Sequence, residues 1–202
     1  MLKLYYSPGA CSLASDIALR EAGLDFELVK VDLKSKKIED GRNYLEIYKA
    51  GKVPALDIGE PSVLTESPAV LQYIADRAPD SRLAPKPTDP ARYRLQSRLN
   101  YLGSEVHKLF GPLFMPGATE DMKKLSLETL DKHFAELNDL LSKQEYLLGD
   151  TYTVADCYLF TILGWTRFLN MDISKFPGLT AYVGRIAQRP AVQAALKAEG
   201  LS

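Results

Sequence analysis

Hydrophobic and polar positions change their spacing twice at the start of the chain. Residues 2–6 alternate as in a strand, residues 12–22 have helical spacing, and residues 26–33 form a second apolar, strand-like run. A strand, a helix and a strand in this order are typical of a βαβ unit, in which the two strands pair in parallel. We therefore expect the chain to begin with an α/β layer.

Two short apolar runs and a helical segment follow a mixed polar stretch at residues 34–51. The runs at 54–58 and 62–65 are separated by Gly-Glu-Pro, which predicts a hairpin. Residues 66–78 then return to helical spacing. The predicted order up to this point is β-α-β followed by β-β-α.

A cluster of prolines separates this region from the rest of the chain. Four prolines lie within residues 79–90, too close together for a helix or a central strand. We predict that this segment is a linker between an α/β domain at 1–78 and a second domain at 91–202.

The second domain is predicted to be all-helical. Helical spacing covers residues 91–114, 120–141, 153–168 and 176–189, and a last short helix begins at Pro190. In the first of these segments, apolar residues recur at alternating steps of four and three, the period of one buried helix face. They are Leu95, Leu99, Leu102, Val106, Leu109 and Leu113.

Composition and charge exclude several classes of function. Hydrophobic residues make up 46% of the 202 residues and charged residues 25%, as in ordinary globular proteins. A formal net charge of -1 argues against binding to nucleic acid, and no apolar run is long enough to span a membrane. The N-terminus does not resemble a signal peptide. The two cysteines form neither a disulfide framework nor a metal-ligand pattern, so we expect a cytoplasmic protein without a metal.

The first candidate for chemistry is Cys11, which follows a Pro-Gly break at the start of the first predicted helix. A helix N-terminus favours the thiolate, which is the reactive form of cysteine. The alternative is a buried, inert thiol. Ala14 stands where a Cys-x-x-Cys motif would have its second cysteine. Redox chemistry at Cys11 would therefore need an external thiol such as glutathione.

Two further segments look like parts of a ligand site. Ser67 and Pro68 are typical of an N-cap and a first-turn proline, and such a helix start accepts anions. Together with Glu66 it would suit an amino-acid-like zwitterion, although simple capping is the alternative. Pro54 begins a short strand, and on composition alone the Val53–Pro54 bond is expected to be trans.

A polar stripe accompanies the leucine face of the helix predicted at 91–114. Asn100, Ser104, His107 and Lys108 fall at i, i+4, i+7 and i+8. The stripe is either a solvated surface or, through His107 and Lys108, a source of donors to an anionic ligand or a thiolate.

Two features of the third predicted helix complete the survey. Thr153 and Asp156 fit a capping box at the start of this helix, which we interpret as structural. Trp165, towards the far end, either faces the cleft between the domains or simply finishes the helix.

Taken together, these segments resemble the beta-class bacterial glutathione transferases. The likeness begins with LYYSPGACSL at residues 4–13 and extends over essentially the whole chain. Its other parts are residues 19–21, 51–56, 64–67, 104–108, the 153–158 box with Phe160, and 185–192.

The resemblance implies a glutathione transferase fold, in which an α/β thioredoxin-like N-terminal domain precedes an all-helical C-terminal domain. It also implies a homodimer and a cis Val53–Pro54 bond, which replaces the trans expectation. Cys11 would face the glutathione sulfur, form a mixed disulfide with it, and act with His107 as a catalytic residue. Lys36 or Lys37 would serve the glycine carboxylate. The other implied glutathione-binding residues are Ser12, Val53, Pro54, Glu66, Ser67, Asn100, Ser104 and Lys108.

Two positions depart from the family pattern. Asp16 stands where these enzymes usually have a histidine, and an acid there would raise the pKa of a nearby thiol. Tyr48-Lys49-Ala50 replaces the usual Asn-Pro-Lys before the Gly51 turn.

The predicted function is transfer of glutathione, as its thiolate, to small hydrophobic electrophiles in detoxification. Thiol–disulfide or peroxidase activity through Cys11 would accompany it. The alternative is a non-catalytic binding or regulatory module with the same fold.

Overall fold

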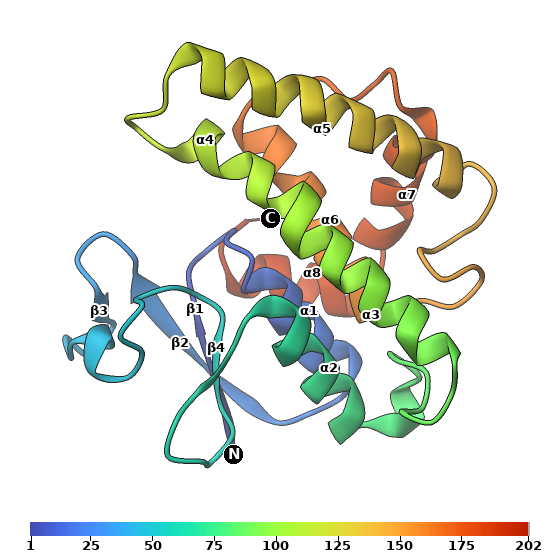
Figure 1. Cartoon of the computed structure of the whole chain (residues 1–202). Helices are drawn as coiled ribbons and strands as arrows, with labels where there is room; N and C mark the ends of the chain where they lie inside the picture. Colours follow the sequence, from blue (N-terminus) through green and yellow to red (C-terminus); the bar gives the residue numbers. More distant parts are fainter. Residues whose placement is uncertain (202) are drawn as a thin grey trace.

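The computed structural model describes residues 1–201; Ser202, the last residue of the predicted helical domain, lies outside them. The first part of the chain forms a five-stranded sheet in the order β3-β2-β1-β4-β5 with two helices (Figure 1). Its elements are β1 (Leu2–Tyr6), α1 (Leu13–Glu21), β2 (Phe26–Asp32), β3 (Lys37–Ile38), the 3₁₀ turn η1 (Tyr44–Glu46), β4 (Ala55–Asp57), β5 (Leu64–Thr65) and α2 (Ser67–Arg77).

The strand pairing confirms the predicted α/β layer. β1 and β2 are parallel, with Leu4 opposite Leu28, and β4 and β5 form the antiparallel hairpin. β4 also runs antiparallel to β1. The sequence pattern did not reveal β3, because two residues within a polar segment are too few to show a period.

The remainder of the described chain is helical, as predicted. Its elements are the 3₁₀ turn η2 (Pro79–Ser81), α3 (Ala91–Tyr101), the π-helical η3 (Leu102–Val106), the 3₁₀ segment η4 (His107–Phe110), α4 (Gly111–Phe114), α5 (Glu120–Leu141), α6 (Val154–Phe168), α7 (Pro177–Ala187) and α8 (Pro190–Ala198). Among residues 1–201, no helix is long and apolar enough to cross a membrane.

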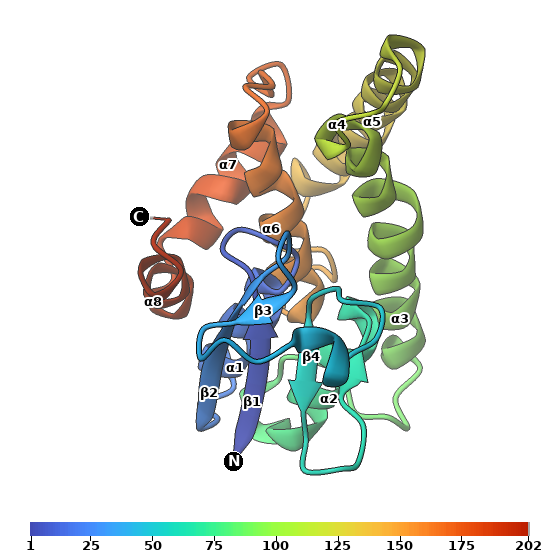
Figure 2. The ribbon, with the colours of Figure 1, turned by 90° about the vertical axis from the view of Figure 1, so that its left-hand side faces the viewer.

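One continuous hydrophobic core joins the two parts of the molecule. α1 and α2 lie between the sheet and α6, and α8 packs against α1 (Figures 1 and 2). Leu4 of the sheet, Ile17 of α1 and Leu159 of α6 are fully buried in the same cluster. The domain boundaries at 78 and 90 stay a prediction, since this core crosses them.

The helix predicted at 91–114 changes its geometry in the middle. The π-helical η3 accommodates one extra residue per turn, and the buried face shifts by one position after Val106. Phe110 is therefore buried, whereas Leu109, which the leucine period placed in the core, is only partly buried. This irregular stretch contains Ser104 and ends directly before His107.

The capping box at α6 is present. Both the backbone N–H and the hydroxyl of Thr153 donate to Asp156 Oδ2, at 2.9 and 3.1 Å. Oδ1 accepts from the Leu147 N–H at 2.9 Å and from the Tyr182 hydroxyl at 3.1 Å. Burial raises the pKa of Asp156 to about 6, although these hydrogen bonds oppose the shift. Through these hydrogen bonds, Asp156 connects the start of α6 to the preceding loop and to α7.

Candidate active site

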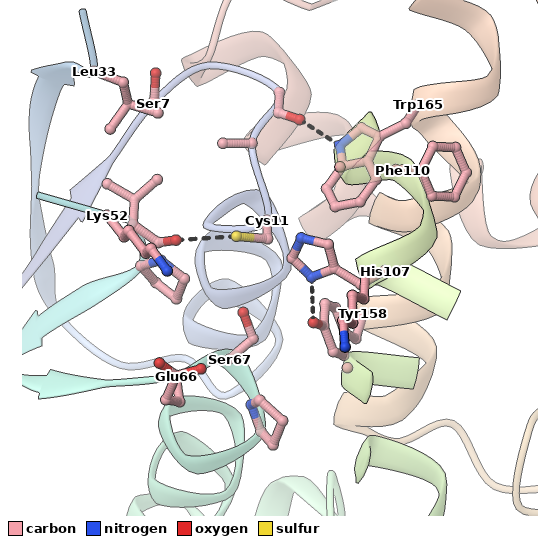
Figure 3. A pocket seen from close by; sticks show the side chains of 18 of the residues that line it. Ser7, Cys11, Leu33, Lys52, Glu66, Ser67, His107, Phe110, Tyr158 and Trp165 are labelled. Carbon is pink, nitrogen blue, oxygen red and sulfur yellow. Dashed lines mark hydrogen bonds between the residues drawn. The ribbon is translucent and has the colours of Figure 1, made fainter. Parts of the chain in front are cut away.

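A cavity of about 1450 Å³ lies where the end of β1 and the starts of α1 and α2 face α3, η4 and α6 (Figure 3). The fold brings ten of the eleven predicted site residues to its lining. They are Cys11, Lys36, Val53, Pro54, Glu66, Ser67, Asn100, Ser104, His107 and Lys108. The exception is Ser12, which is fully buried and whose hydroxyl accepts from the Ser7 N–H at 3.2 Å.

Cys11 occupies the centre of one wall. α1 begins two residues later, and the Cys11 thiol donates to the Val53 carbonyl at 3.0 Å (Figure 3). Burial raises the pKa of this thiol to about 11, although hydrogen bonds from Ser67 and from the backbone N–H groups of Cys11 and Ser12 lower it. Burial thus outweighs the helix start, which favours the neutral thiol among the two alternatives for Cys11.

The segment before β4 has a cis peptide bond and is anchored by a buried tyrosine. The Val53–Pro54 peptide is cis, as the resemblance implied, so the trans expectation from composition was wrong. Tyr44 of η1 is fully buried, and its hydroxyl donates to the Lys52 carbonyl at 2.7 Å. This contact fixes the backbone just before Val53, whose carbonyl accepts from the Cys11 thiol.

The start of α2 differs in detail from the prediction. Glu66, rather than Ser67, is the N-cap residue, and Ser67 is the first residue of the helix. The φ angle of Glu66 is 67°, a left-handed backbone that costs a non-glycine residue about 1–3 kcal/mol. Strain of this kind concentrates at functional sites. The Glu66 side chain is exposed towards the cavity and the Ser67 side chain is buried beside it (Figure 3).

Of the two lysines considered, Lys36 lines the cavity and Lys37 does not. The Lys36 ammonium donates to the Gly51 carbonyl at 2.8 Å. A Cβ at Gly51 would come within 2.8 Å of Leu45 and 3.1 Å of the Lys36 stem. Gly51, with a φ of 59°, is thus needed for the lysine to cross the turn to the cavity rim.

Aromatic side chains form the opposite wall. The Trp165 ring contacts His107, Phe110 and Phe114, with centroid distances of 4.6, 5.2 and 6.1 Å. Its indole N–H donates to the Gly9 carbonyl at 2.8 Å, which ties this wall to the loop before Cys11. Burial lowers the pKa of His107 to about 4, so its ring is neutral at pH 7.

Sequence reasoning missed part of this wall. Tyr158 lies in the cavity with its hydroxyl 2.6 Å from His107 Nδ1, and Phe114 and Phe168 line the cavity as well. Tyr158 and Trp165 are seven positions apart, two turns of one helix face. That spacing was a usable signal, but the nearly uniform apolarity of α6 concealed it.

Asp16, the departure from the family pattern, points away from the cavity. It is fully buried and paired with Arg20 at 2.6 Å. It is not among the main causes of the raised pKa of Cys11, of which burial is the largest. The expected effect of Asp16 on the thiol is therefore minor beside that of burial.

A thiol, a strained acidic residue and a basic side chain thus face an aromatic wall across one cavity. On a thioredoxin-like sheet followed by helices, this arrangement defines the class of glutathione-dependent proteins. Sequence models of that class match two stretches: the glutathione S-transferase N-terminal domain at residues 1–76 and the C-terminal domain at residues 103–190.

Individual relatives agree with these matches. The chain is 42% identical over 200 residues to glutathione S-transferase GstA of Escherichia coli O157:H7, covering 99% of this chain and 100% of the relative. A sphingomonad glutathione S-transferase complexed with glutathione is 52% identical, with a TM-score of 0.95. The bacterial beta class enzyme of Sphingomonas chungbukensis is also 52% identical, with a TM-score of 0.96. Both alignments cover 99% of this chain and 100% of the solved chain.

The chain therefore belongs to the glutathione S-transferase family, among the bacterial beta-class enzymes. The predicted fold and the predicted transferase activity are confirmed, and the non-catalytic module is the less favoured alternative.

Proposed function

We propose that this enzyme binds glutathione along the Cys11 wall of the cavity and transfers it to small hydrophobic electrophiles held by the aromatic wall. The observation that carries the proposal is one cavity lined by Cys11, Glu66, Ser67 and Lys36, with His107 opposite Cys11. The Cys11 thiol meets Ser67 on one side and the Val53 carbonyl on another, and Lys36 is bonded to Gly51, two residues before Val53. A tripeptide with an amino acid at one end, a carboxylate at the other and a thiol between them complements this order of groups.

The two ends of the peptide have matching partners. The Glu66 carboxylate attracts the ammonium group of the γ-glutamyl end, and the start of α2 at Ser67 attracts its α-carboxylate. Lys36 and Lys108 attract the glycine carboxylate from the rim. Asn100 and Ser104, which are exposed and line the cavity, contribute polar contacts to the peptide or across a dimer.

The conjugation step uses the sulfur of glutathione itself. Its thiol loses a proton to solvent, the thiolate attacks the electrophilic carbon, a C–S bond forms, and the leaving group departs with its electron pair. The backbone N–H groups of Cys11 and Ser12, which lower the pKa of the Cys11 thiol, would stabilise that neighbouring thiolate as well, and His107 would donate to it from the other side. A neutral Cys11 thiol supports this division of roles, because a thiol is a poor nucleophile.

The aromatic wall supports a hydrophobic second substrate. Phe114 and Phe168 are 49% and 58% exposed, although both are large apolar side chains at the cavity. Covering them with an apolar ligand removes this surface from water, which favours binding.

A second activity is favoured by the free Cys11 thiol in the centre of the cavity. Its deprotonated sulfur would attack the mixed disulfide of glutathione and a substrate thiol, take over the glutathione as a Cys11 disulfide and release the substrate as its thiolate. A second glutathione thiolate would then regenerate Cys11 and release oxidised glutathione. After incubation with oxidised glutathione, intact mass is expected to show one adduct in the wild type and none in Cys11→Ala. An adduct on Cys157 instead would return Cys11 to a structural role.

We also propose that the enzyme acts in detoxification as a cytoplasmic homodimer. Free thiols at Cys11 and Cys157 suit a reducing compartment. The exposed rim of Asn100 and Ser104, on a helix that already buries its leucine face, supports a dimer with the ligand site near its interface. Light scattering that gives a monomer at micromolar concentration would contradict the dimer.

Turnover is the test of the main proposal. Purified protein should be retained on glutathione resin and should conjugate glutathione to chlorodinitrobenzene. A panel that adds hydroxyethyl disulfide and peroxide separates conjugation from the Cys11 chemistry. Retention on the resin without turnover of any of the three compounds would contradict the enzymatic proposal.

A further inference from the structure

The contact between Tyr158 and His107 joins two distant elements inside the cavity. Tyr158 is on α6, His107 begins η4, and the phenol oxygen lies 2.6 Å from the Nδ1 atom of the ring (Figure 3). Tyr158 is 1% exposed, and the imidazole also meets the Trp165 ring at a centroid distance of 4.6 Å. The imidazole is thus packed from one side and hydrogen-bonded from another.

The direction of this hydrogen bond follows from the two groups. Burial raises the pKa of Tyr158, so the phenol keeps its proton at neutral pH, and the Ser67 hydroxyl opposes that shift as a hydrogen-bond partner. Because the Ser67 hydroxyl lowers that pKa, it acts as a donor to the phenol, and His107 Nδ1 at 2.6 Å is the acceptor found for the phenol proton within residues 1–201. A buried hydroxyl with an unsatisfied proton is costly, so the Tyr158 O–H donates to Nδ1.

The other ring nitrogen then has a fixed role. A neutral imidazole that accepts at Nδ1 carries its hydrogen on Nε2. Burial keeps the His107 ring neutral at pH 7. In Figure 3, Nε2 is on the side of the ring that faces Cys11. The N–H of His107 is therefore directed to the region of the Cys11 sulfur.

We propose that Tyr158 is a positioning residue, which fixes His107 as an Nε2–H donor to the sulfur of bound glutathione. The inference rests on the proposed function, in which that sulfur occupies the space beside Cys11. A hydrogen bond to the thiolate lowers the pKa of the glutathione thiol. With its hydrogen on Nε2, the ring cannot accept the thiol proton at that atom, so the proton leaves to solvent and His107 stays neutral.

The tautomer can be observed directly. The chain has two histidines, His107 and His133, and a His133→Gln variant assigns their ¹⁵N resonances. His133 bonds to Tyr101 on α3 and does not line the cavity. We expect His107 in the wild type to carry its hydrogen on Nε2 at pH 7. A hydrogen on Nδ1 would overturn the inference without affecting the transferase assignment, and this readout needs no variant of Tyr158.

Kinetics tests the consequence. Tyr158→Phe keeps the ring and removes the hydroxyl, and Tyr152→Phe is the matched control. Tyr152 is another buried tyrosine of the helical part; its hydroxyl is hydrogen-bonded to Cys157, and it does not line the cavity. In the pH profile of kcat/KM for chlorodinitrobenzene at saturating glutathione, we expect the midpoint of Tyr158→Phe to rise by about 0.5–1 unit. Tyr152→Phe should keep the wild-type midpoint, and the KM for glutathione should change less than about twofold in both.

Three outcomes contradict parts of the account in different ways. A wild-type midpoint in Tyr158→Phe, together with a raised midpoint in His107→Ala, would overturn the role of Tyr158 alone. A wild-type midpoint in His107→Ala would overturn the donor role of His107 and, with it, the inference. An equal rise in Tyr152→Phe would mean that the shift reflects the loss of any buried hydroxyl, and would also overturn the inference.

Discussion

At the scale of single residues, backbone strain and burial separate the groups that bind from the group first expected to react. Glu66 has a left-handed backbone, and its carboxylate is exposed at the cavity. Cys11 is at a helix start, yet its thiol is neutral because burial raises the pKa to about 11. We therefore propose that Glu66 recognises the peptide and that glutathione supplies the nucleophilic sulfur.

Glu66→Ala is expected to weaken glutathione binding. Loss of a charged hydrogen-bonding partner costs about 1.5–3 kcal/mol, equivalent to about 10-fold to 150-fold in Kd. Glu60→Ala removes an exposed carboxylate from the nearby hairpin and is the matched control, since Glu60 does not line the cavity. Calorimetric titration measures both, and an unchanged affinity in Glu66→Ala would exclude Glu66 from the site.

At the scale of elements, α6 contributes part of the aromatic wall of the cavity. Its N-terminal capping box is buried, and further along the helix Tyr158 and Trp165 reach the cavity. The functional face of the helix therefore depends on how firmly its first turn is fixed.

Thr153→Ala is expected to destabilise the fold without changing the chemistry of the folded enzyme. Loss of an N-cap costs about 0.5–2 kcal/mol, and this buried cap is expected at the upper end. Thr119→Ala, at the exposed N-cap of α5, is the comparison and should cost less. Chemical denaturation gives both values. Equal stability of Thr153→Ala and the wild type would contradict a stabilising role of the capping box.

The accuracy of the predicted elements depended on how many residues each periodic run contains. Long runs such as α5 and α6 were predicted nearly to the residue, whereas β3 was too short to show any pattern. The π-helical η3 was invisible because a leucine period assumes a constant turn.

The site divides in the same way. The predicted site residues form recognisable local motifs, and ten of the eleven meet at one cavity. Tyr158 acquires its position only when η4 and α6 come together, which no local pattern encodes. The pKa of Cys11 likewise depends on burial by the whole fold rather than on its helix start.

At the scale of the whole molecule, the end of the chain closes over the loop that carries Cys11. Glu199, just after α8, is buried, and its Oε2 accepts from the Gly9 N–H at 2.8 Å. Burial raises the pKa of Glu199 to about 8, and Asp16 adds to the shift while Arg20 opposes it. Both side chains are on α1, against which α8 packs.

This arrangement predicts a pH-dependent stability. The folded state keeps a proton on Glu199 up to about pH 8, whereas the unfolded chain loses it near pH 4.5. The free energy of unfolding should therefore fall as pH rises through this window, by at most about 1.4 kcal/mol per pH unit for one proton. Glu199→Gln should flatten the fall between pH 6 and about 8, and exposed Glu46→Gln should not. Denaturation at several pH values gives the free energy of unfolding of the wild type and both variants. The same pH dependence in all three proteins would contradict a buried proton on Glu199.

The central claim is that the sulfur of glutathione, rather than that of Cys11, attacks the electrophile. Conjugation of glutathione to chlorodinitrobenzene by Cys11→Ala, followed together with the mass of the wild-type protein during turnover, tests it most directly. The account predicts that the variant retains part of the wild-type kcat and that the wild-type protein carries no dinitrophenyl group. Complete loss of conjugation in a folded variant, with a dinitrophenyl group on Cys11 of the wild type, would contradict it.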